Sequence, residues 1–387
     1  MSNNNYFNLI DFGSSKIRFA VYDNNLEKKY SESKFILPEN NYKNHFNYIA
    51  DTVKRAEKKF SYHIKDVILL LDSSNVFTID ISLSKKLDNQ SKLNKIYNSI
   101  ILELNQLILK YYDTYNILHI IIDKCLIDNK IYDKLPKNEY ISSNLKIDFK
   151  IICLPNNLIS NLKNKFIENN LNILNISCSS YIKSNSYKEK SDQKKISFLD
   201  IGWERTSLIF YENNKLKFII SVPIGSNHIT KDISKVFKIN LDQAEKIKKS
   251  FNKSDTEFSY HEDFPQTTIS AKEILNKKIS IELLKKVILY RVQEIMDLIY
   301  KKVNHNIYNN KFENTELILI GEGSVLFNDN SFYLDNKFNF NSIKFFNEED
   351  SQICKNGLIH HLNNFKIPAT GNKKQGIFEK FFNIFSN

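Results

Sequence analysis

The sequence predicts an α/β protein of two related lobes, each with a mixed sheet flanked by helices. The main observation is an internal repeat, in which residues 196–215 (ISFLDIGWERTSLIFYENNK) align with residues 7–26 (FNLIDFGSSKIRFAVYDNNL). Each copy reads as an apolar strand, an Asp-x-Gly turn, a second apolar strand and an Asn-Asn turn. A repeat of this length usually reports architecture, although two ordinary hairpins are the alternative.

Composition narrows the class of protein. The 387 residues suffice for two domains or more, and 42% hydrophobic residues can fill their cores. The net charge of +11 favours an anionic partner, but the lysines are scattered and no nucleic-acid motif accompanies them. The four cysteines have no metal-binding spacing and predict reduced, cytosolic thiols. No signal peptide and no apolar run of ~20 residues is expected, so a membrane would be met at its surface.

Apolar periodicity predicts further elements along the chain. Helices are expected over residues 45–60, 93–111, 157–169, 227–237, 241–251, 274–303 and 351–362. Strands are expected over residues 67–71, 76–83, 117–122, 146–153, 173–178, 218–223 and 316–320. The polar stretch 184–195 (SNSYKEKSDQKK) reads as a linker between the two copies.

The turns suggest a chemistry. Glycine lets the backbone approach another group closely, and hairpin N–H groups can converge on a phosphate. Asp11 and Asp200 end the incoming strands, where a carboxylate can hold a hydrated Mg²⁺. Two such turns, one from each half of the chain, could clamp one nucleotide between the lobes.

The order of motifs identifies a family. DFGSSKIR, LDIGWERTSL, AEKIKKSF, LILIGEGS and a helix ending NGLIHH follow one another. This order resembles the actin/Hsp70/sugar-kinase ATPase fold, and within it the chain is similar to FtsA, the bacterial cell-division family that ties FtsZ to the membrane. Residues 221–248 resemble the second lobe of FtsA, and residues 81–155 have the size of its inserted α/β subdomain.

The resemblance implies six segments. They are a first lobe core (1–80), an inserted subdomain (81–155), a return to the first lobe with a linker (156–195), a second lobe (196–362), a linker (363–375) and a membrane-targeting helix (376–387).

The resemblance also implies a site for ATP with Mg²⁺, with Asp11 and Asp200 on the metal side. The implied nucleotide-binding residues are Asp11, Gly13, Ser14, Ser15, Lys16, Asp200, Gly202, Arg205, Thr206, Glu245, Lys248, Gly321, Gly323 and Ser324. Glu245 and Lys248 stand three positions apart on one helix face, where a surface ion pair is the simpler interpretation.

The glycine motifs depart from the family pattern. Trp203 and Glu204 stand where the second phosphate turn usually has glycines, and Glu322 separates Gly321 from Gly323. A Cβ at these positions restricts close backbone approach, and Glu204 brings negative charge towards a phosphate. No catalytic residue can be named, so enzymatic activity is left open and would amount at most to a weak ATPase.

The last twelve residues form a candidate amphipathic helix. Placed at ~100° per residue, its apolar side chains fall in one arc and its polar ones in the other. The candidate membrane residues are Ile377, Phe378, Lys380, Phe381, Phe382, Ile384 and Phe385. An interfacial helix near anionic headgroups fits this pattern. Docking on its own domain, or in the groove of a partner protein, is the alternative.

The resemblance implies a filament-forming adaptor at the cytoplasmic face of the bacterial inner membrane, at the division site. Its implied partners are the FtsZ C-terminal peptide, further copies of itself, anionic lipid and later divisome proteins. Lys277, Lys278 and Lys285 are candidate contacts for the FtsZ peptide, although solvated lysines are the ordinary interpretation. A PilM-like or MreB-like scaffold, or a small-molecule kinase of the same fold, is the alternative function.

Overall fold

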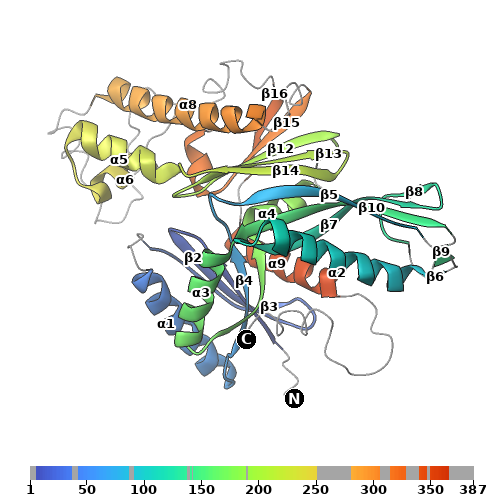
Figure 1. Cartoon of the computed structure of the whole chain (residues 1–387). Helices are drawn as coiled ribbons and strands as arrows, with labels where there is room; N and C mark the ends of the chain where they lie inside the picture. The colour runs from blue at the N-terminus through green and yellow to red at the C-terminus, as the bar shows by residue number, and fades with distance from the viewer. Residues whose placement is uncertain are drawn as a thin grey trace.

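Two five-stranded sheets of the same topology form the two lobes, which confirms the predicted fold class (Figure 1). The computed structural model describes residues 6–36, 42–86, 91–136, 140–141, 143–188, 191–250, 280–305, 314–327, 340–346 and 349–365. The first sheet has the order β11-β4-β1-β2-β3. Its strands are β1 (Tyr6–Phe12), β2 (Lys16–Asp23), β3 (Lys28–Phe35), β4 (Asp66–Leu71) and β11 (Asn172–Cys178).

The second sheet repeats this arrangement in the order β14-β13-β12-β15-β16. Its strands are β12 (Lys195–Ile201), β13 (Thr206–Glu212), β14 (Lys215–Val222), β15 (Thr315–Ile320) and β16 (Phe340–Phe345). In both sheets the hairpin strands pair antiparallel and the two following strands pair parallel. The central strands are buried almost throughout, because helices cover both faces of such a sheet.

Helices cover the outer faces of the sheets. The first lobe carries α1 (Lys43–Phe60) and α3 (Asn156–Glu168). The second carries α5 (Ser226–Phe237), α6 (Leu241–Ser250) and α8 (Ile281–His305), and α8 lies across the second sheet in Figure 1. These helices bury the apolar stripes that predicted them, such as Ile49, Val53 and Ala56 on α1.

A separate small sheet follows β4 in the chain. It has the order β5-β10-β7-β8 and packs its core against α2 (Leu93–Tyr111), whose bounds are those predicted. The strands are β5 (Phe77–Lys86), β7 (Tyr115–Ile127), β8 (Lys130–Tyr132) and β10 (Asn144–Pro155), with a short pair of β6 (Ser91–Lys92) and β9 (Tyr140–Ile141) nearby. The boundaries proposed for the six segments stay predictions.

The predicted linker 184–195 is wrong in its first part. Helix α4 (Ser179–Tyr187) runs into it, and Lys183, Ser184 and Tyr187 are buried. The polar composition of this stretch predicts exposed residues. Its side chains are buried because β13 and α9, which are distant in sequence, pack against the helix.

Two further elements differ from expectation. Strand β3 occupies a stretch that reads as a polar loop; it is an edge strand, where exposed charged side chains are common. Helix α9 (Asp350–Phe365) extends into the predicted second linker and packs against the first sheet, not against the second lobe to which the sequence assigns it. Gly357 permits this approach, because a Cβ there would stand 2.8 Å from a methyl group of Leu70 in β4.

Some predictions concern residues outside the described part of the chain. These are Lys277, Lys278 and the seven candidate membrane residues of 376–387. Among the helices that the structure describes, none combines the length and the apolar character needed to cross a bilayer.

Candidate functional site

A cavity of about 260 Å³ lies between the two Asp-x-Gly turns. Nine of the predicted nucleotide-binding residues line it, namely Asp11, Gly13, Ser14, Ser15, Lys16, Asp200, Gly202, Arg205 and Gly321. Five predicted residues do not line it, namely Thr206, Glu245, Lys248, Gly323 and Ser324. The repeat therefore brings its two turns to one place.

The glycine amides of the turns are used inside the turns. The Gly13 N–H donates to the carbonyl of Lys16 at 3.0 Å, and the Gly202 N–H donates to the carbonyl of Arg205 at 2.9 Å. A Cβ at Gly13 would stand 2.6 Å from that Lys16 oxygen, so the turn requires glycine for its own closure. These two amides are therefore engaged within their own turns, and the assignment of Gly13 and Gly202 to nucleotide binding stays a prediction.

Asp11 is buried and paired within the protein. Its carboxylate accepts from the Arg18 guanidinium at 2.8 Å and from the Ser179 hydroxyl at 2.9 Å. Arg18 also donates to Asp350, at 2.6 Å, and to Glu322, at 3.2 Å. Burial alone lowers the pKa of Arg18, but Asp11 and Asp350 outweigh it and raise this pKa.

Lys16 also points to carboxylates. Its ammonium forms ion pairs with Glu322 and, at 3.0 Å, with Asp350. Glu322 begins the 3₁₀ helix η2 (Glu322–Phe327) and is the residue that separates Gly321 from Gly323. Lys16, one of the implied nucleotide-binding residues, thus already pairs with two carboxylates.

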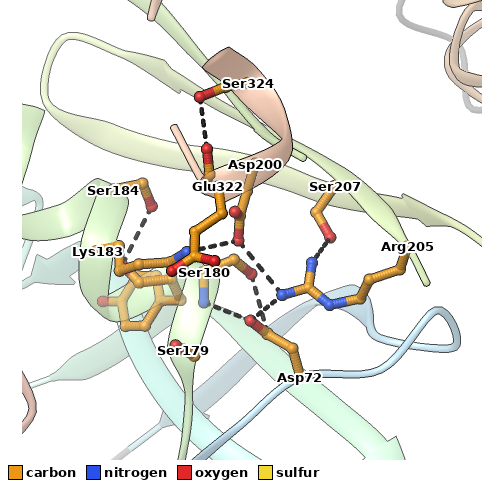
Figure 2. A network of polar contacts seen from close by, with 12 residues as sticks. Asp72, Ser179, Ser180, Lys183, Ser184, Asp200, Arg205, Ser207, Glu322 and Ser324 are labelled. Carbon is orange, nitrogen blue, oxygen red and sulfur yellow. Dashed lines mark hydrogen bonds and ion pairs between the residues drawn. The ribbon is translucent and has the colours of Figure 1, made fainter. Parts of the chain in front are cut away.

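Asp200, the second aspartate, lies in a second charge network, which Figure 2 shows from close by. It accepts from Lys183 at 2.9 Å and from Arg205 at 3.3 Å, and Arg205 also pairs with Asp72. Burial raises the pKa of Asp72. Burial acts on Asp200 in the same direction, but the nearby cations outweigh it and lower the pKa of that carboxyl.

Helix α4 supplies side chains to both networks. Ser179 reaches Asp11, the Ser180 amide and hydroxyl donate to Asp72 at 2.8 and 3.0 Å, and Lys183 reaches Asp200. Sequence reasoning missed these residues, as it missed Arg18, Asp72 and Asp350, and it singled out Glu322 only as an interruption of the glycine pair. One of them had a signal in the two-lobe architecture. Asp72 directly follows β4, just as Gly321 directly follows β15, the equivalent strand of the second sheet.

Glu245 and Lys248, two of the implied nucleotide-binding residues, lie outside the cavity lining. Glu245 and Lys248 form an ion pair at 2.6 Å, and both also contact the Thr230 hydroxyl. The Lys248 ammonium lies 4.8 Å from the centre of the Trp203 ring, which lines the cavity. Burial lowers the pKa of Lys248 to about 8. The pair is buried, so the surface ion pair considered from the sequence is also not what the structure has.

The remaining predicted residues serve the local fold. Gly321 has φ +85°, and a Cβ there would stand 2.5 Å from a carboxylate oxygen of Asp200. A Cβ on Gly323 would stand 2.9 Å from the carbonyl of Ile201. The Thr206 hydroxyl donates to the carbonyl of Ile224 at 2.8 Å, and the Ser324 hydroxyl donates to that of Gly321.

The cavity was tested against the nucleotide that the resemblance implies, and as arranged it does not fit one. Its volume of about 260 Å³ is close to the lower end of the ~300–1,000 Å³ of ordinary small-molecule pockets, so the misfit is one of charge. Its lining holds more carboxylates than cations, namely Asp11, Asp72, Asp200, Glu204 and Glu322 against Lys16, Arg18, Lys183 and Arg205. Each of these cations has a carboxylate partner, so a polyphosphate would have to break existing ion pairs.

A metal site is not evident among the described residues, where no three His, Cys, Asp or Glu side chains gather as ligands would. One polar atom of the lining is unsatisfied within the described chain, the buried Trp203 indole N–H. It is a single donor, and one acceptor oxygen would satisfy it.

Comparison with known proteins gives two family matches. A model of the type IV pilus assembly protein PilM matches residues 9–261, more than half of the chain. A model of the cell division protein FtsA matches residues 197–377.

Curated relatives are FtsA proteins of low identity. FtsA of Helicobacter pylori (strain ATCC 700392 / 26695) is 26% identical over 126 residues, which are 32% of this chain and 25% of that protein. FtsA of Staphylococcus epidermidis (strain RP62A) is 24% identical over 207 residues, which are 52% of this chain and 44% of that protein. The matched stretches therefore span less than half the length of these relatives.

Two solved structures share the fold. A chain of the PilM-PilN type IV pilus biogenesis complex superposes with a TM-score of 0.55 at 14% identity, covering 91% of this chain and 94% of that one. MreB5 of Spiroplasma citri bound to ADP superposes with a TM-score of 0.50 at 13% identity, covering 94% and 97%. The sheets and the cavity between them thus define a protein of the actin-like ATPase fold. The chain belongs to the PilM family of this fold. Its second half also matches the FtsA model, and the curated relatives named above are FtsA proteins.

Proposed function

We propose that the chain is a filament-forming adaptor of bacterial cell division that anchors FtsZ polymers to the inner face of the cytoplasmic membrane and helps to recruit later divisome proteins. The observation that carries the proposal is the FtsA match over residues 197–377, which runs from the second sheet to the start of the tail. The paired charges of the cavity support a scaffold in preference to an enzyme, because each lining cation already has a carboxylate partner.

The membrane contact is assigned to residues 376–387. Ile377, Phe378, Phe381, Phe382, Ile384 and Phe385 form the apolar side and Lys380 lies towards anionic headgroups. With twelve residues this helix is at the lower end of the ~12–15 residues below which helicity in water is marginal, so it folds on the bilayer and one copy binds weakly. Copies joined in a filament bind tightly, because each further contact is intramolecular.

The FtsZ contact is assigned to the second lobe near the start of α8. Lys285 is half-buried on that helix, and Lys277 and Lys278 precede it in the chain. Lysines there would attract an acidic peptide, and their mutation to glutamate would slow its association.

ATP with Mg²⁺ is the ligand that the family resemblance implies, and MreB5 of the same fold carries ADP. The adaptor proposal does not depend on it, because membrane attachment and partner binding are assigned to surfaces away from the cavity. Any ATPase activity is expected to be weak.

The test is co-sedimentation with vesicles of phosphatidylglycerol and phosphatidylethanolamine, with and without FtsZ. The samples are the full chain, a truncation after Gln375, Phe381→Ser on the apolar side of the tail and Asn383→Ser on its polar side as the matched control. The full chain and Asn383→Ser are expected to pellet and to carry FtsZ with them. The truncation and Phe381→Ser are expected to stay in solution. Equal pelleting of all four samples would refute the tail as the membrane anchor. If the full chain pellets with the vesicles but leaves added FtsZ in solution, the adaptor function is refuted.

A PilM-like scaffold is the second candidate, favoured by the PilM match over residues 9–261. It would bind a PilN-type protein in place of FtsZ, as the solved PilM-PilN complex suggests for that relative. Pull-down of a PilN-type protein but not of FtsZ by the full chain would support it.

A further inference from the structure

Side chains of the two halves meet across the cavity. Arg205 of the second lobe pairs with Asp72, which follows β4 of the first sheet. On another side of the cavity, Lys16 and Arg18 of β2 pair with Glu322 of the second lobe. These contacts are long-range, since Arg205 and Asp72 are 133 positions apart.

Helix α4 adds a third connection. It continues directly from β11 of the first sheet, and its Lys183 reaches Asp200 of the second sheet at 2.9 Å. Lys183, Asp200 and Asp72 are all nearly buried. Figure 2 shows Asp200 joined to both Lys183 and Arg205, and Asp72 joined to Arg205. Removing one partner of a buried ion pair leaves an uncompensated charge out of water, so each bridge can be tested by substituting one of its residues.

An aromatic contact accompanies the ion pairs. The ring of Trp203 meets that of Phe35, on β3 of the first sheet, edge to face with centroids 5.3 Å apart. Lys248 lies over the Trp203 ring, and Lys249 lies 4.2 Å from the centre of the Phe35 ring. The indole thus fills the space between β3 and helix α6 and covers the Glu245–Lys248 pair.

We infer that the two lobes of this protein are held closed by its own side chains, without nucleotide. Arg205–Asp72, Lys183–Asp200 and the pairs on Glu322 neutralise the two turns, and Trp203 occupies the approach to Glu245 and Lys248. The inference concerns the cleft alone and stands whichever partner the adaptor binds.

The chain contains a convenient probe, since Trp203 is its one tryptophan. The first experiment titrates the full chain with an N-methylanthraniloyl derivative of ATP and Mg²⁺, following energy transfer from Trp203 to the nucleotide. No saturable transfer is expected up to millimolar nucleotide. Saturable transfer that unlabelled ATP reverses would overturn the inference.

The second experiment measures quenching of Trp203 by acrylamide in the absence of nucleotide. The wild-type ring is expected to be protected, with a quenching constant close to that of a buried indole and unchanged by ATP with Mg²⁺. Arg205→Gln and Asp72→Asn, which each remove one bridge, are expected to raise this constant several-fold.

Arg291→Gln is the matched control. Arg291 pairs with Asp232 through two hydrogen bonds of 2.6 and 2.8 Å, between α8 and α5 and away from the cavity. It is expected to leave the quenching of Trp203 unchanged. A freely quenched Trp203 in the wild type, or protection that appears only with ATP, would overturn the inference. Failure to bind FtsZ would not affect these readouts, so the two proposals fail separately.

Discussion

Substitution of Arg18 by methionine tests whether the first charge network is a buried one. The side chain of Arg18 is 11% exposed and that of Asp11 is 7% exposed, whereas Asp350 and Glu322 are 35% and 48% exposed. The variant removes one cation from three carboxylates. Asp350 and Glu322 keep Lys16 as a partner, but Asp11 keeps only the Ser179 hydroxyl among the contacts described here.

The expected loss of stability follows from these exposures. Breaking a buried ion pair by removing one partner costs about 3–5 kcal/mol, whereas an exposed pair contributes ~0–1 kcal/mol. We therefore expect Arg18→Met to lower the free energy of unfolding by about 3 kcal/mol, nearly all of it from Asp11. The double variant Arg18→Met/Asp11→Asn removes the stranded charge and is expected to recover most of this loss.

The assay is urea unfolding at neutral pH, followed by the fluorescence of Trp203 and by circular dichroism. Arg55→Met is the control, because the Arg55–Glu32 pair lies on the same lobe with side chains 49% and 31% exposed. It is expected to cost no more than ~1 kcal/mol. Equal losses for the Arg18 and Arg55 variants, or no recovery in the double variant, would refute the reasoning.

Three further predictions address single positions. Gly321→Ala forces a left-handed backbone on alanine and a clash with Asp200, and should lower the thermal midpoint by an amount equivalent to ~2 kcal/mol or more, whereas an unchanged midpoint would contradict the close approach. The pKa of Asp350 is lowered to about 2, chiefly by Arg18 against the effect of burial, so its stabilisation is present above the unfolded pKa near 4 and is lost as pH falls towards 2. Wild type should therefore lose about 1 kcal/mol more than Asp350→Asn between pH 5 and pH 2 in acid unfolding, after allowance for solvent screening; parallel curves would contradict this. Burial raises the pKa of Cys153 to about 12, and all four cysteines are buried, so a thiol reagent at pH 8 should label the chain only as it unfolds, and immediate reaction of any thiol would contradict the packing.

The sequence by itself determined the architecture of the two lobes. The repeat of strand, Asp-x-Gly turn and strand predicted two sheets, and the structure has two with the same strand order. Local periodicity located helix α2 to the residue and the other predicted helices with shifted ends, because an apolar stripe at helical spacing indicates the buried face. It failed for α4, whose polar side chains are covered by β13 and α9. It also failed for β3, an edge strand whose polar side chains stay exposed.

The state of the candidate site was decided by the tertiary structure. The sequence located the two turns and the substitutions Trp203, Glu204 and Glu322, but the cations that meet the site acids come from remote positions. Arg18 and Asp350, for example, are 332 positions apart. Whether a charged side chain is open to a phosphate or already neutralised depends on burial and on distances of a few ångströms, which spacing along the chain does not encode. For that reason the same motifs that predict a nucleotide clamp form, in the folded protein, a cleft closed on its own charges.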